Sequence, residues 1–313
     1  MDSRWKKAIG LVIAGVILFF MVRSLISGLG ELGTYEFSIS YPRVVGSFAV
    51  LAVLFPVYGM VWQYILRKFG CGISFSRSMR VWFLSQAGRY IPGKVWFALG
   101  RIYLCEREGI PRAVATVATG LELVLVLGSA IIVFGIAAAL SPSLPGRPYA
   151  LGLLLVPLIV IAVHPRIIRA LLVKLRRMPA DFNLAYTDTL KILAFYMGCW
   201  CIYGLGYFLI GTSFDLGVTV PDLQSAGAGR IIPDMIGINA LSWSAGLVSI
   251  VTPAGLGVRE GISGILLSRI VDKPYPVLIP LVARIWVTLA EVGTIGIVLL
   301  LRGPKDTEER NRA

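Results

Sequence analysis

The chain has 313 residues, of which 57% are hydrophobic and 15% are charged, and its formal net charge is +13. A mean hydropathy of +0.79 excludes an ordinary soluble domain. The positive charge does not indicate nucleic-acid binding, because the basic residues lie in short segments between apolar runs, as in multi-pass membrane proteins. We therefore expect an all-α polytopic membrane protein.

Six apolar stretches are long enough, or nearly so, to cross about 30 Å of hydrocarbon as helices. They are residues 8–25, 44–66, 113–140, 149–164, 190–212 and 277–301. The first fits an uncleaved anchor better than a signal peptide, since it lacks a convincing cleavage site. Basic residues cluster before the first stretch and after the second, fourth and last, so both termini are expected in the cytoplasm.

Two further stretches, residues 76–105 and 229–271, are only partly apolar and are broken at their centres by proline and glycine. Each is either an irregular full span or a re-entrant pair of half-helices that returns to its own side. We favour re-entry, because each half is too short to span alone and re-entry keeps every strongly basic connection cytoplasmic. Non-helical backbone at this depth must be buried in protein or line water.

A repeated sequence pattern relates two of the spans, each of which follows a broken hairpin. In both, a proline is followed by a threonine after eight residues and by a glutamate after eleven: Pro111, Thr119 and Glu122, and Pro280, Thr288 and Glu291. The pattern predicts a single membrane domain, 1–313, built as an inverted repeat of halves 1–140 and 149–313. Their hairpins would enter from opposite sides, as in many alternating-access transporters.

The first hairpin carries a group of polar and turn-forming residues that are candidates for substrate binding: Gln86, Arg89, Tyr90, Pro92, Gly93, Lys94 and Arg101. Pro92 is suited to begin the second half-helix, whose free N–H groups would then point into the membrane. Together with Arg89 and Lys94 they would form an anion site. The alternative is that both cations extend to the membrane interface.

The second hairpin contributes the candidates Thr252, Pro253, Gly255, Gly257, Arg259 and Glu260. Two glycines after a proline permit a tight, unwound turn in which backbone groups face a ligand. Arg259 and Glu260 either contact that ligand or form ion pairs that lock the turn. Asn239, upstream, either joins the site or bridges helices by hydrogen bonds.

Charged residues inside the spans complete the candidate site, since a charge in hydrocarbon normally faces a cavity or a partner. They are Glu122, Arg284 and Glu291. The carboxylates either neutralise hairpin arginines or carry a proton. One histidine and four cysteines without ligand spacing predict no metal site and no cofactor. No nucleotide-binding GxxxxGK[ST] loop is present.

With QAGRYIPGKVW at 86–96 and TPAGLGVRE at 252–260, nearly the whole chain resembles the flippase-like transmembrane part of lysylphosphatidylglycerol synthases, the multiple peptide resistance factor family, and their stand-alone relatives. In full synthases a soluble domain aminoacylates phosphatidylglycerol and the membrane part moves the product. The resemblance implies a multi-pass protein of the prokaryotic cytoplasmic (inner) membrane. The residues matching the family hairpins are Arg89, Pro92, Gly93 and Lys94, and Pro253, Gly255, Gly257 and Glu260.

The sequence ends soon after its last span, at Ala313, without a synthase domain, so we expect lipid translocation without the transferase reaction. The cationic first hairpin favours an anionic head group, either a phospholipid or a polyprenyl-phosphate-linked lipid. The protein is not expected to be an enzyme. One alternative is a membrane-embedded enzyme acting on a lipid phosphate, with Glu122 or Glu291 in acid–base roles. Another is an accessory subunit that serves a lipid- or glycan-synthesis enzyme.

Overall fold

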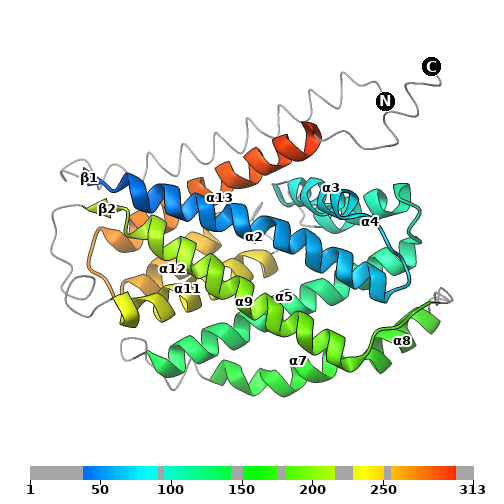
Figure 1. The fold of residues 1–313 in the computed structure, drawn as a ribbon. Helices are drawn as coiled ribbons and strands as arrows, with labels where there is room; N and C mark the ends of the chain where they lie inside the picture. The colour runs from blue at the N-terminus through cyan, green and yellow to red at the C-terminus, as the bar shows by residue number, and fades with distance from the viewer. Residues whose placement is uncertain are drawn as a thin grey trace.

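A computed structural model describes residues 38–90, 95–141, 151–174, 181–215, 228–249 and 255–300. In these ranges the protein is a helical bundle with one short pairing of two strands, which confirms the predicted all-α membrane fold (Figure 1). The predicted first span, 8–25, lies outside the described residues. Five helices are long and apolar enough to cross a membrane: α2 (Tyr41–Lys68), α5 (Arg112–Leu140), α9 (Tyr186–Gly211), α11 (Ala228–Val248) and α13 (Tyr275–Leu300).

The predicted span 149–164 is the first arm of a bent pair and not one complete straight helix. A 3₁₀ turn (η2, Leu151–Leu155) leads into α7 (Val156–Ala162), and α8 (Pro165–Lys174) follows after a bend of 47°. Pro165 causes the break, because proline lacks an N–H donor and disfavours a helical residue before it. Only the two arms together are long and apolar enough to count as a span.

The first broken stretch forms a helical hairpin, as predicted. It consists of α3 (Phe75–Gln86), the 3₁₀ turn η1 (Ala87–Tyr90) and α4 (Trp96–Arg107). Each α-helix has 12 residues and is therefore about 18 Å long, too short to span. Arg77 near the start of α3 lies 3.6 Å from Glu108 just after α4, so both ends of the hairpin lie on the same side.

Next to the turn of this hairpin, the backbone of η1 packs directly against the backbone at the start of α4. A Cβ atom at Gly88 would lie 2.6 Å from the backbone nitrogen of Phe97. Only glycine therefore fits at this point of η1, where the turn crosses the first residues of α4. The neighbouring residues Arg89 and Tyr90 are consequently held at a fixed depth in the bundle.

The second broken stretch also turns back, but its arms are unequal. The prediction that both halves are too short to span is wrong for α11, which has 21 residues, of which 231–248 form a candidate span. The returning helix α12 (Val258–Leu267) has 10 residues. Gly255, with φ +72°, packs against Gly246, where a Cβ atom would lie 2.7 Å from the Gly246 Cα. This contact places the start of α12 beside the end of α11.

The two hairpins approach each other from opposite ends of the bundle (Figure 1). The α3–α4 hairpin enters from the end that carries Lys68 and Arg112, which we call the basic end. The middle of α11 instead packs against the late part of α5, where Gly237 lies beside Ala137. The arrangement has the relation required of an inverted repeat, while the halves 1–140 and 149–313 stay a prediction.

Helices α2 and α9 pack side by side and are joined at both of their ends. At one end β1 (Ser38–Ile39) pairs antiparallel with β2 (Phe214–Asp215). At the basic end the Lys68 ammonium lies 3.1 Å from Asp188, and the Tyr64 hydroxyl donates to the same carboxylate at 2.6 Å. These contacts fix α2 against α9 at both ends of the pair.

The fold predicts that cysteines placed at Arg112 and Lys273 are labelled from opposite sides of the membrane. Arg112 lies at the basic end, whereas Lys273 precedes α13, whose Ile279 packs near Gly211 at the far end of α9. In a variant lacking the four native cysteines, an impermeant maleimide should reach Arg112→Cys and Lys273→Cys from different sides. Labelling of both from one side would contradict the hairpin topology.

Candidate functional site

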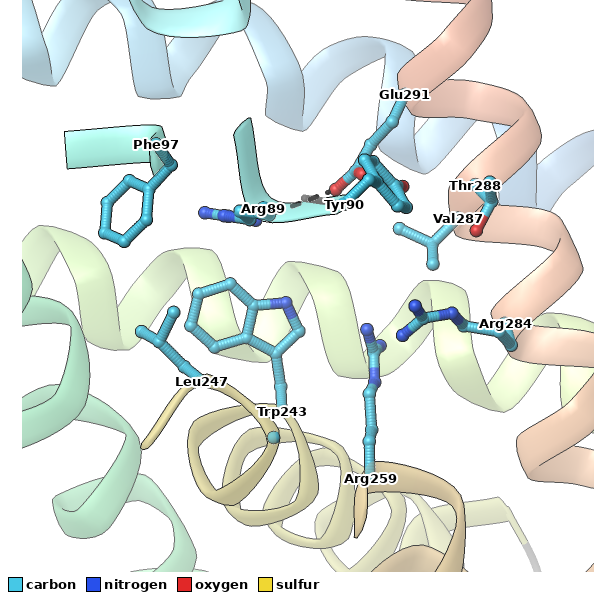
Figure 2. A pocket seen from close by; sticks show the side chains of 11 residues that line it. Arg89, Tyr90, Phe97, Trp243, Leu247, Arg259, Arg284, Val287, Thr288 and Glu291 are labelled. Atoms are coloured by element: carbon cyan, nitrogen blue, oxygen red, sulfur yellow. Dashed lines mark hydrogen bonds and ion pairs between the residues drawn. The ribbon is translucent and has the colours of Figure 1, made fainter. Parts of the chain in front are cut away.

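The tips of the two hairpins meet at a cavity of about 510 Å³ (Figure 2). We call it the arginine cavity, because three guanidinium groups line it. Its wall is formed by η1 and α4 of the first hairpin, by α11 and α12 of the second, and by α13. The lining residues are Arg89, Tyr90, Phe97, Trp243, Gly246, Leu247, Arg259, Arg284, Val287, Thr288 and Glu291.

The three arginines make the cavity strongly cationic. Arg89 Nη1 lies 3.8 Å from Glu291 Oε1, which is an ion pair without a close hydrogen bond, and Arg89 Nε has no hydrogen-bond partner in the described part of the chain. Figure 2 shows the guanidinium groups of Arg259 and Arg284 directed into the same space. Three arginines face one carboxylate in this lining. Planar guanidinium groups bind phosphate and carboxylate oxygens bidentately, so the arrangement favours an anion.

Each arginine is held in place by a contact behind the cavity. Arg259 Nη2 donates a hydrogen bond of 2.9 Å to the Tyr203 hydroxyl. Arg284 Nη1 lies 3.7 Å from Glu260 Oε1, while the other Glu260 oxygen accepts the Gly257 N–H at 2.7 Å and caps α12. The Arg89 guanidinium lies over the Trp243 ring, 5.0 Å from its centroid. These contacts orient the charges before any ligand arrives.

Glu291 joins the first hairpin to α13. Its Oε2 accepts a hydrogen bond of 2.5 Å from the Tyr90 hydroxyl, and its Oε1 faces Arg89. Since Arg89 and Tyr90 are adjacent on η1, one carboxylate fixes both residues of the hairpin tip. This geometry fits the neutralising role predicted for Glu291, and the proton-carrying role stays a prediction.

Glu122 is embedded in a hydrogen-bonded cluster with Arg101. The two form an ion pair, and Glu122 Oε1 also accepts hydrogen bonds from Trp82 Nε1 at 2.8 Å and from the Tyr196 hydroxyl at 3.0 Å. Arg101 Nε donates to Ser85 Oγ at 3.0 Å. Both charges are almost fully buried, and Arg101 lies over the rings of Trp62 and Trp82. This pair is therefore a fixed part of the bundle interior.

A second cavity of about 810 Å³ adjoins the arginine cavity and shares Arg89, Trp243 and Glu291 with it. Gln86, Arg101 and Glu122 also line this second space. Glu122 and Glu291, the two glutamates of the repeated sequence pattern, therefore line one interior region. The residues of α9 that line it are Tyr196, Cys199, Trp200 and Tyr203.

The remaining predicted site residues are distributed differently. Asn239 and Glu260 line a third cavity of about 220 Å³, and Arg259 lines both this cavity and the arginine cavity. Gly255 and Gly257 both have positive φ, +72° and +81°, and form the turn into α12. The predicted residues Pro92, Gly93, Lys94, Thr252 and Pro253 lie outside the described residues.

Sequence reasoning missed most of the aromatic lining. Tyr196, Trp200, Tyr203 and Tyr207 recur at the i, i+4, i+7 and i+11 spacing of one helix face, which was the available signal. In a membrane helix such a face is equally suited to lipid or to a core. Among the described residues, no group of three or more histidine, cysteine or acidic side chains could hold a metal ion.

The fold and the cavity define a multi-pass membrane protein with an anion-attracting space between two opposed hairpins. The chain belongs to the family of the lysylphosphatidylglycerol synthase TM region, which matches residues 7–292. The resemblance inferred from the two hairpin motifs is thereby confirmed. A search of curated proteins finds no match to the chain.

Proposed function

We propose that this protein translocates an anionic lipid across the membrane and binds its head group in the arginine cavity. The observation that carries the proposal is the convergence of Arg89, from one hairpin, with Arg259 and Arg284 on a single cavity between opposed hairpins. An arginine inside a bundle requires either a partner or a ligand, because hydrocarbon penalises an uncompensated charge. A phosphate oxygen would complete the contacts of Arg89, whose Nε has no partner among the described residues.

Membership of a family of lipid-handling membrane regions supports a lipid as the substrate. The polar cavity would accommodate the head group, while the acyl or polyprenyl tails stay in the surrounding bilayer. Either an anionic phospholipid or a polyprenyl-phosphate-linked lipid satisfies this chemistry. A lipid- or glycan-synthesis enzyme is then the natural partner, because it would supply or consume the translocated lipid.

The distribution of charge supports an orientation for the proposed transporter. Arg67, Lys68, Arg77, Arg80 and Arg112 lie at the basic end, which by the positive-inside rule faces the cytoplasm of a prokaryotic inner membrane. Both termini would then also be cytoplasmic. In this orientation the first hairpin enters from the cytoplasm and the second from outside, so each tip contacts the head group from its own side.

Reconstitution in protein-only liposomes tests the proposal. Fluorescent analogues of an anionic and a zwitterionic phospholipid are placed in the inner leaflet, and their arrival outside is followed by a membrane-impermeant quencher. We expect the protein to accelerate relocation of the anionic analogue well above that of the zwitterionic one. Chemical conversion of the lipid would instead indicate an enzyme, and unchanged relocation of both analogues would contradict translocation and favour an accessory role.

A further inference from the structure

The second cavity differs in chemistry from the arginine cavity beside it. Its walls come from α2, α3, α5 and α9 as well as from the hairpin tips, and they are dominated by aromatic rings. We call it the aromatic compartment. It adjoins the arginine cavity, because Arg89, Trp243 and Glu291 line both spaces.

The rings of the aromatic compartment are held in position by contacts with one another. Tyr58 stacks on Trp82 with ring centroids 5.0 Å apart, and Trp200 packs edge-to-face on Trp243 at 5.3 Å. Trp200 is fixed further by a hydrogen bond of 3.0 Å from its Nε1 to Ser129 Oγ. Rigid aromatic surfaces of this kind offer a large contact area to a flat, partly apolar group, such as the C–H face of a ring.

Gln86 gives the compartment a polar group with unused hydrogen-bonding capacity. Its side chain lines the compartment and the residue is 2% exposed, yet neither the amide oxygen nor the amide nitrogen has a partner among the described residues. Few native buried polar groups are left in this state. An amide both donates and accepts, so the group that satisfies it best does the same, as a hydroxyl does.

The charges around the compartment disfavour a cation as its occupant. Glu122 is engaged by Arg101, Trp82 and Tyr196, and Glu291 is engaged by Tyr90 and Arg89. Each carboxylate in the described lining is therefore already paired with an arginine. The guanidinium groups of Arg89 and Arg101, in the same lining, would repel an ammonium group.

We propose that the aromatic compartment binds a sugar ring joined to the phosphate that the arginine cavity holds. The substrate is then a lipid whose head group is a glycosyl phosphate. Arg89 contacts the phosphate at the junction of the two spaces, the ring packs against the aromatic side chains, and Gln86 bonds to its hydroxyls. This inference rests on the proposed function and adds the second half of the head group to it.

Calorimetric titration of the purified protein in neutral-lipid nanodiscs tests the proposal. The probes are butyl phosphodiesters of equal charge at phosphorus, carrying a glucosyl, glyceryl, methyl or aminoethyl group. We expect the glucosyl diester to bind at least about tenfold more tightly than the methyl diester, on the order of the free energy of one or two neutral hydrogen bonds. The glyceryl diester, which has hydroxyls but no ring, should bind between these two.

Gln86→Leu isolates the contribution of the amide. The variant should lose most of the preference for the glucosyl diester over the methyl diester, while its affinity for the methyl diester stays unchanged. Its melting temperature should be no lower than that of the wild type, because an unsatisfied buried amide has been removed. Gln63→Leu is the matched control: Gln63 donates to the Ile73 carbonyl at 2.7 Å, so its replacement should lower the melting temperature but leave the glucosyl preference intact.

The possible outcomes distinguish failure of the sugar assignment from failure of the proposed anion site. Equal affinity for the glucosyl and methyl diesters, or tightest binding of the aminoethyl diester, would overturn the sugar assignment while leaving the anion site standing. An equal loss of affinity for all four diesters in Gln86→Leu would also overturn the sugar assignment, because the amide would then have a structural role. Failure of every diester to bind the wild type would overturn the proposed anion site together with this inference.

Discussion

Arg89→Ala should weaken binding of the anionic lipid by about 2–5 kcal/mol, the usual cost of removing one member of a desolvated, charge-assisted contact. The variant should still fold. The described contacts of the Arg89 guanidinium include the 3.8 Å ion pair with Glu291 and the contact with the Trp243 ring, and Glu291 keeps its hydrogen bond from Tyr90. Lipid binding by calorimetry and relocation in liposomes should therefore both fall while the melting temperature changes little. Arg89→Lys should retain only a part of the lipid-binding affinity, because an ammonium group cannot form the bidentate hydrogen bonds of a guanidinium group.

Arg112→Ala is the control for this experiment. Its side chain is 74% exposed and forms a surface ion pair of 2.7 Å with Glu106. Exposed pairs contribute about 0–1 kcal/mol to stability, so neither folding nor lipid binding should change appreciably. If Arg89→Ala and Arg112→Ala behave alike in lipid binding and relocation, the arginine cavity is not the head-group site.

Glu122→Gln should destabilise the fold by about 3–5 kcal/mol, because it leaves the Arg101 charge buried without its counter-charge. The glutamine oxygen can still accept from Trp82 and Tyr196, so the loss reports mainly on the broken ion pair. Thermal and denaturant unfolding in detergent measure it. Arg101→Met combined with Glu122→Gln should be less destabilised than the sum of the two single variants, since neither charge is then left alone.

Glu106→Gln provides the matched control, since it breaks the exposed ion pair with Arg112 and should cost less than about 1 kcal/mol. One other result for Glu122→Gln would assign a proton-carrying role to Glu122. If the variant is as stable as the wild type and binds lipid, but relocation no longer responds to an imposed pH gradient, Glu122 carries a proton and does not serve as a static counter-charge.

Much of the architecture could be predicted from the sequence, because a bilayer imposes strong constraints on length and polarity. Apolar length identified α2, α5, α9 and α13. Central proline and glycine residues identified both hairpins. The cost of an unpaired charge in hydrocarbon was enough to infer that Arg89, Arg284 and Glu291 face the interior, and all three line the arginine cavity.

What could not be predicted depends on pairings between distant segments. The sequence contains no sign that Glu122 pairs with Arg101, 21 positions away, or that Glu291 accepts a hydrogen bond from Tyr90, 201 positions away. The aromatic compartment was missed because rings on α9 have the same spacing whether they face lipid, core or cavity. The first arm of the second hairpin was predicted to be too short to span, whereas α11 has 21 residues and continues through Pro233.

The double attachment of α2 to α9 limits how the protein can move. The strand pair connects the two helices at one end, and the contacts of Lys68 and Tyr64 with Asp188 connect them at the other. A pathway opened by parting these helices would have to break both sets of contacts in every cycle. Among the described residues, the first hairpin contacts α13 through the Glu291 carboxylate, and it contacts α11 of the second hairpin where Arg89 lies over the Trp243 ring. We therefore expect any motion that admits a ligand to occur at the hairpin tips, with the α2–α9 pair as the stationary frame.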